Sequence, residues 1–214
     1  MLRIFEFFKK NKRISIFAII ILCALSIIFI INFTRKAYKN TNIGNNISNK
    51  TLDEVEDYIL NISSYKAKLE ATINSNKNTN KYILTQIHNK YEDVQEVILP
   101  ENIKGMKLTY KDKTLTIQNI VLDLQKVYNN YPYIESNNLW LNSFIEEYKI
   151  AKNKKISVKD ENIVMSIEII GDSKIKYKEL YLDKKTLKPT KLLIQDNNKK
   201  EIIYILYNEI ELNY

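Results

Sequence analysis

The sequence contains one histidine, one cysteine and three glycines in 214 residues, and each of these shortages excludes a class of function. With His88 alone, a multi-histidine metal site is excluded and a histidine-based catalytic triad is disfavoured. Three glycines leave neither a phosphate-cradling loop nor a dinucleotide fingerprint. Cys23 lies inside a long apolar run, so the rest of the chain has no disulfide, thiol nucleophile or thiolate metal site. The sequence therefore predicts no catalytic residues, no metal and no cofactor.

Acidic residues do not supply a catalytic pair either. Several of them stand next to one another, including Asp53–Glu54, Glu56–Asp57, Glu92–Asp93 and Glu146–Glu147. Because neighbouring residues of a helix or strand point to different faces, solvated charge explains these pairs better than an acid/base site does. His88 shares the phase of Tyr82, Leu84 and Gln86 in an alternating run, which favours an ordinary strand position over a catalytic one. We therefore expect a protein that is not an enzyme.

What the chain does have is a long hydrophobic run. Residues 14–33, ISIFAIIILCALSIIFIINF, carry no charge, and a helix of 20 residues covers about 30 Å, the thickness of a bilayer core. A cleaved signal peptide would have an apolar core of about 7–15 residues and a small-x-small site after it, which is missing here. Large residues (Ile-Ile-Leu) precede Cys23 and argue against a lipid-attachment box, so we expect a buried, unmodified thiol. We interpret the run as an uncleaved transmembrane helix.

The basic residues predict how this helix is oriented. Residues 1–39 hold eight of the 33 Lys and Arg but one of the 25 Asp and Glu, and most of this positive charge precedes the span. The positive-inside rule then places residues 1–13 in the cytoplasm and everything after Phe33 on the far side. The rest of the chain, with 25 basic and 24 acidic residues, is nearly neutral, so we expect no nucleic-acid surface.

Beyond the span, the hydrophobic pattern predicts a linker and one folded domain, residues 51–214. Residues 34–50 are polar and without period, as in a flexible tether. Thr51 and Glu54 form a capping box at the start of an amphipathic helix, after which residues 65–73 alternate between apolar and polar, as in a strand. Similar short runs recur to the end of the chain and predict about ten or eleven strands.

A second amphipathic helix, LWLNSFIEEYKIA, interrupts the strands, with Asn137 or Asn138 as its expected cap. Residues 120–128, before it, fit either a strand or a helix, and we favour a strand. The domain is therefore predicted to be mainly β (α+β), a mostly antiparallel sheet that curls around, with two helices covering one face.

Aromatic side chains gather around this second helix. The chain has 15 Tyr, 7 Phe and 1 Trp, and the group nearest the helix is Tyr131, Tyr133, Trp140, Phe144 and Tyr148. One interpretation is core packing by large side chains; the other is an amphipathic surface for a protein partner or a lipid. We take these five residues as the candidate partner or ligand surface.

The domain resembles a known family in several segments. These include YKAKLEATINSNKNTNKY, LWLNSFIEEY and, most specifically, LPENIKG (99–105) and LYLDKKTLKPTKL (180–192). Together they resemble the GerS-type germination proteins of clostridial spore formers, which are similar in fold to lipoprotein carrier and outer-membrane lipoprotein-sorting proteins. The chain departs from the lipoprotein members at Cys23, which lacks the residues of a lipid-attachment box.

The resemblance implies both a fold and a role. The fold would be a half-barrel of antiparallel strands with helices over its concave side. The role would be non-catalytic: partnering the sporulation amidase (CwlD type) that trims peptides from cortex muramic acid before muramic-δ-lactam forms. The protein would then lie on the extracytoplasmic side of the membrane, in the forespore intermembrane space of a sporulating cell. A lipid- or lipoprotein-binding carrier is the alternative, and a homodimer is possible in either case.

Overall fold

The computed structural model describes residues 50–75, 77–119, 121–133, 137–170 and 174–214. The predicted membrane helix, its cytoplasmic tail and nearly all of the linker lie outside these residues. Within the described part of the chain, no helix has both the length and the apolar character needed to cross a bilayer.

Helix α3 (Leu52–Leu60) begins where the capping box predicts. The Thr51 hydroxyl accepts a hydrogen bond from the Glu54 N–H at 3.3 Å, and the Glu54 carboxylate accepts one from the Thr51 N–H at 2.7 Å. Two of the orphan donors of the first turn are thereby satisfied. The helix buries Val55 and Ile59.

The described residues form an antiparallel sheet of eleven strands, as the sequence predicts. The strands are β1 (Ser64–Asn74), β2 (Thr79–His88), β3 (Asp93–Leu99), β4 (Lys107–Lys111), β5 (Thr114–Asn119), β6 (Leu124–Tyr128), β7 (Asn153–Lys159), β8 (Asn162–Glu168), β9 (Tyr177–Asp183), β10 (Pro189–Gln195) and β11 (Glu201–Asn213). The strand predicted within 120–128 is confirmed for its second half, which is β6.

Two meanders make up this sheet. The spatial order is β6-β5-β4-β3-β2-β1-β11-β10-β9-β8-β7, so strands adjacent in sequence pair throughout each meander, and the first strand also pairs with the last. β1 and β11 are the longest strands, with 11 and 13 residues, and their register runs from Ser64–Asn213 to Ile73–Ile203. The first and last strands thus lie side by side in the middle of the sheet, while β6 and β7 form its two edges.

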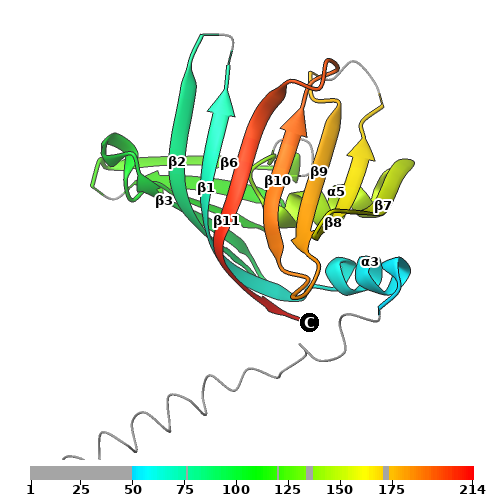
Figure 1. The fold of residues 1–214 in the computed structure, drawn as a ribbon. Helices are drawn as coiled ribbons and strands as arrows, with labels where there is room; N and C mark the ends of the chain where they lie inside the picture. Colours follow the sequence, from blue (N-terminus) through cyan, green and yellow to red (C-terminus); the bar gives the residue numbers. More distant parts are fainter. Residues whose placement is uncertain (1–49, 76, 120, 134–136, 171–173) are drawn as a thin grey trace, which may run out of the picture. The chain divides into compact units, whose positions relative to one another are not determined.

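The sheet curves around helix α5 (Leu141–Ile150). Asn142 of α5 contacts Asp93 of β3, and Glu147, five residues on, contacts Lys178 of β9. Those strands are five positions apart, about 24 Å in a flat sheet, whereas five helical residues rise by about 7.5 Å. The sheet must therefore bend toward the helix, and in Figure 1 strands β3–β6 run across behind the other strands.

Both helices lie on the inner face of this curve. Val55 and Ile59 of α3 and Phe144 and Tyr148 of α5 belong to one hydrophobic cluster with the inward side chains of the strands. The predicted arrangement of two helices on one face of a curled sheet is confirmed.

The two segments that best carry the family resemblance each contain a turn between strands. After β3, the 3-10 helix η3 (Glu101–Ile103) leads to Gly105, whose φ of +76° suits glycine and whose N–H donates to the Val97 carbonyl at 2.9 Å. Between β9 and β10, the Asp183 carboxylate accepts hydrogen bonds from the Thr186 N–H and hydroxyl at 2.7 and 2.8 Å. Leu187, which follows this turn, is buried in the core.

Candidate functional site

The predicted aromatic cluster lies mostly inside the molecule. Trp140, Phe144 and Tyr148 are buried, and the last two belong to the main core. Tyr133 is buried as well, and Tyr131 is half-buried at the rim. In this fold, therefore, the helical members of the group fill the hollow of the sheet. Whether the group also binds a partner or ligand remains a prediction.

The structure brings these side chains together in two groups. Tyr133 stacks on Tyr110 of β4 at 4.3 Å between ring centroids and meets Trp140 edge-on at 5.7 Å. One turn apart, Phe144 and Tyr148 lie at 5.9 Å. Edge-on and offset arrangements are those that aromatic pairs favour. The stacking fixes the segment before α5 against the β4 side of the sheet.

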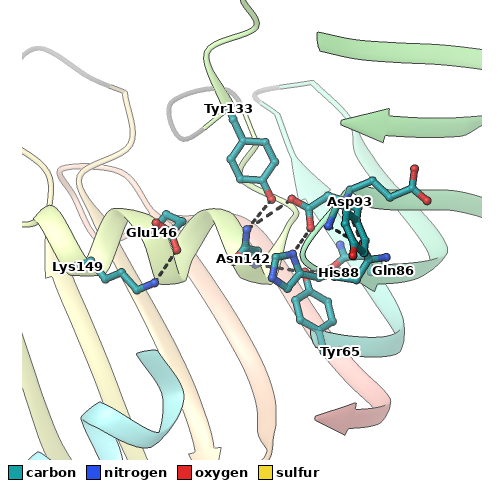
Figure 2. Close-up of polar contacts among 11 residues, drawn as sticks. Tyr65, Gln86, His88, Asp93, Tyr133, Asn142, Glu146 and Lys149 are labelled. Carbon is teal, nitrogen blue, oxygen red and sulfur yellow. Dashed lines mark hydrogen bonds and ion pairs between the residues drawn. The ribbon is translucent and has the colours of Figure 1, made fainter. Parts of the chain in front are cut away.

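Beside this cluster lies a buried polar network centred on Asp93 (Figure 2), which the sequence analysis missed. Asp93 is 5% exposed, and its carboxylate contacts Nδ1 of His88 and accepts a hydrogen bond from Nδ2 of Asn142 at 3.5 Å. Tyr133 lies within hydrogen-bonding reach of the same carboxylate, and Tyr65 stacks on the His88 ring at 5.3 Å between centroids. The prediction that Asp93 is solvated is wrong, because its side chain points to the inner face of the sheet and lies against α5.

The tyrosines around Asp93 are held in their neutral form. Burial, with the negative charge of Asp93 as a second cause, raises the pKa of Tyr133, Tyr65 and Tyr110 above the ordinary tyrosine value. A neutral phenol can both donate and accept a hydrogen bond. Tyr133 accepts a hydrogen bond from Nδ2 of Asn142 at 3.4 Å, and its hydroxyl lies beside the Asp93 carboxylate.

The network also holds the start of α5. The helix begins at Leu141, after Trp140 in the N-cap position, so the predicted caps at Asn137 and Asn138 are wrong. No side chain of the local sequence caps it; instead the Tyr65 hydroxyl, from β1, accepts the Asn142 N–H at 3.2 Å. A distant residue thus satisfies one of the orphan donors of the first turn.

Two buried glutamines extend this attachment. Nε2 of Gln86 donates to the Leu139 carbonyl at 2.7 Å and to Oε1 of Gln95 at 2.9 Å. Gln86 and His88 share the inward phase of Leu84, as Asp93 and Gln95 share that of Val97. Polar residues in an apolar phase were therefore the sequence signal that could have revealed the network.

The other end of α5 is held by charge. Glu147 forms an ion pair with Lys178 of β9, whose side chain is 3% exposed. The solvated state predicted for Glu147 is thus wrong. Nearby, the Tyr148 hydroxyl donates to Glu56 of α3 at 3.1 Å.

This arrangement is suited to fixing a helix rather than to chemistry. The donors and acceptors around Asp93 are directed at one another and at the backbone of α5. Among the described residues, no group of three or more His, Cys, Asp or Glu side chains is placed to hold a metal ion. On the outer face of β7–β10, an open hollow of about 320 Å³ is lined largely by polar and charged side chains, including Lys155, Glu179 and Gln195.

The fold and this helix-filled inner face define a class of curved-sheet domains with helices in the hollow. No protein-family model matches the chain, and no curated protein matches it in sequence. Among solved structures, the chain is similar to the GerS lipoprotein in its complex with the CwlD amidase from Clostridioides difficile, with 23% identity and a TM-score of 0.50. That match covers 77% of this chain and 97% of GerS. The predicted GerS-type fold is confirmed.

Two further structures are similar at lower identity. One is an uncharacterized conserved protein from Thermus thermophilus, at 9% identity, a TM-score of 0.48 and coverage of 77% of this chain and 88% of that one. The other is a LolA superfamily protein from Nitrosomonas europaea, at 10% identity, a TM-score of 0.45 and coverage of 77% and 94%.

Proposed function

We propose that this chain is a membrane-anchored, non-enzymatic binding protein of sporulation and germination that partners a spore-cortex N-acetylmuramoyl-L-alanine amidase of the CwlD type. The observation that carries the proposal is the match to GerS, which spans 97% of a protein whose structure was determined with that amidase. The domain would lie on the extracytoplasmic side, held close to the membrane by the helix predicted over residues 14–33. By binding the amidase there, it would support cortex modification.

The filled inner face supports a protein partner over a lipid. A carrier needs an apolar hollow that can take an acyl chain, typically about 300 Å³ or more for a ligand site. Here Phe144, Tyr148 and Leu141 of α5 are buried within the curve of the sheet. The outer hollow is open to solvent and most of its lining residues are polar or charged, so it does not resemble an enclosed apolar site for an acyl chain.

The test is co-purification of the tagged full-length chain from membranes of sporulating cells. We expect the amidase of the same organism to be recovered with it, and to be absent from an untagged strain. Deletion of the gene should then lower the muramic-δ-lactam content of the cortex. Failure to recover the amidase, with both proteins detected in the membrane extract, would overturn the proposal.

A stoichiometric lipid on the same purified protein, found by mass spectrometry without the amidase, would favour the carrier alternative instead. Because the inner face is filled, we expect no such lipid. A carrier would also have to leave the membrane, which an uncleaved anchor prevents.

A further inference from the structure

The last hairpin of the first meander exposes an unusual amount of apolar surface. Every residue from 121 to 130 is exposed, and this stretch includes edge strand β6. Its large apolar side chains are Val121, Leu122, Leu124, Val127 and Tyr128, with 87%, 48%, 54%, 50% and 37% of their surface exposed. In an ordinary monomer such side chains are mostly exposed singly, whereas these five lie within eight consecutive residues, as in a segment that contacts a partner.

The two edges of the sheet are built differently. Edge strand β7 carries Lys154, Lys155 and Lys159 in seven residues, and Lys154 forms a 3.2 Å ion pair with Glu56 of α3. Lysines and covering elements protect a sheet edge against pairing with another strand. Strand β6 has one lysine in five residues, and none of its residues is buried by a helix. Of the two edge strands of the described sheet, β6 is therefore the less protected against pairing with a further strand.

Strand β6 pairs with a described strand along one side of its backbone. It pairs with β5 alone, in a register that runs from Leu115–Tyr128 to Asn119–Leu124, so the N–H and C=O groups on its other side have no strand partner among the described residues. Leu124 and Tyr128 lie opposite inward residues of β5, whereas Val127 lies opposite Thr116 and faces outward. An added strand would therefore gain hydrogen bonds along β6 and apolar contacts on both faces.

The charge around this edge selects the chemistry of the added strand. Residues 107–128 hold four lysines, Lys107, Lys111, Lys113 and Lys126, against Asp112 and Asp123. None of these lysines forms an ion pair with another described residue. The edge is thus apolar with positive surroundings, which complement acidic side chains.

We propose that β6 is the docking edge for an extended segment of the partner amidase, one that carries apolar and acidic side chains and adds to the sheet as a twelfth strand. This inference rests on the proposed function, because it names the surface through which that partner binds. It assigns the interaction to the β6 edge rather than to the aromatic group around α5.

The chain offers a matched pair of variants for the test. Val127 on β6 and Val158 on β7 are both edge valines that are 50% exposed. We expect Val127→Lys to weaken binding of the full-length protein, in detergent, to the purified amidase by about tenfold or more. Val158→Lys should change the Kd less than about twofold, and both variants should keep the thermal midpoint of the native protein.

Amide hydrogen exchange supplies the second readout. Binding of the amidase should slow exchange at residues 124–128 and leave residues 153–159 unchanged. If the native protein does not bind the amidase at all, the proposed function fails. If it binds but Val127→Lys binds equally well and β6 stays unprotected, or if β6 is protected by self-association without the amidase, the inference fails while the proposed function stands.

Discussion

At the residue scale, Tyr65 connects the sheet to helix α5. Its hydroxyl accepts the Asn142 N–H and lies 3.4 Å from Oε1 of Gln86, to which it can donate. Its ring stacks on His88. A single side chain from β1 thus takes the place of the helix cap that the local sequence lacks.

Replacing this hydroxyl should destabilise the protein. In Tyr65→Phe, the partly buried Asn142 N–H and the buried side-chain oxygen of Gln86 each lose a partner, which we expect to lower the free energy of unfolding by about 1–2 kcal/mol. Tyr82 of β2 makes a suitable control. It is half-buried on the same face of the sheet as Tyr65, and its hydroxyl forms no hydrogen bond with the described residues. Tyr82→Phe should be neutral within about 0.5 kcal/mol in chemical denaturation, and equal effects of the two changes would contradict the capping role.

Tyr133 makes stability depend on alkaline pH. Its pKa in the folded protein lies above the value of about 10 expected in the unfolded chain, mainly because of burial. The stability that it contributes is fully present below pH 10 and is lost as the pH rises from there toward the folded-state pKa, because the unfolded chain then releases a proton that the folded protein keeps.

We therefore expect the free energy of unfolding to fall between about pH 10 and 11 by up to about 1.4 kcal/mol per unit for this tyrosine. Tyr133→Phe should lose less stability than the native protein over the same interval, and parallel curves for the two proteins would contradict the prediction. Lysines also titrate in this range, so the difference between the two proteins is the quantity to compare.

At the scale of elements, α5 is fixed at both ends by side chains of the sheet. Its start is held by Tyr65 and the Asp93 network, and its last turns by the buried pair of Glu147 and Lys178. Neighbouring Glu146 forms a pair with Lys149 at 2.7 Å, with about 40% of each side chain exposed. The same helix thus carries one buried and one exposed ion pair (Figure 2 shows the exposed one).

These two pairs should differ in energy. Glu147→Ala leaves Lys178 buried without a counter-charge, and we expect a loss of about 3 kcal/mol, because an unpaired buried charge is strongly destabilising. Lys178→Met should lose less, since Glu147 is 17% exposed and can reach water. Glu146→Ala, the control, should stay within about 0.5 kcal/mol. Equal losses in denaturant titrations for both glutamates would contradict the importance of the buried pair.

The outcome for α5 shows how far sequence patterns reach. Alternation and the Thr51 capping box are local signals, and they predicted the strands and the first helix. The start of α5 depends on a hydroxyl 77 positions away in sequence, and the burial of Asp93 depends on α5 lying over β3. No local pattern contains those contacts. The exposure of β6 likewise depends on which elements cover that edge of the sheet, and no local pattern contains that information.

At the scale of the whole molecule, the two meanders are covered unequally. The centre of the sheet combines the long β1–β11 pairing with a core that α3 and α5 share. Toward β6, the strands shorten to five or six residues, and there the segment around Tyr131 and Tyr133, rather than a described helix, covers the inner face. The other edge, β7, is attached to α3 through Lys154 and Glu56. Stability should therefore decline from the centre toward β6 more steeply than toward β7.

Native-state amide exchange of the full-length protein would measure this gradient. Local opening is least favourable where many buried apolar contacts must break, so amides of β1, β10 and β11 should exchange only through global unfolding. Amides of β6 should exchange fastest among the strands, because each opening there exposes little new apolar surface, and β7 should be intermediate. Protection of β6 equal to that of β11 in the unbound protein would contradict the gradient. A weakly protected edge strand with apolar side chains also gains the most stability when another strand pairs with it. Because the amides of β6 exchange fast in the unbound protein, slower exchange on partner binding can be measured there.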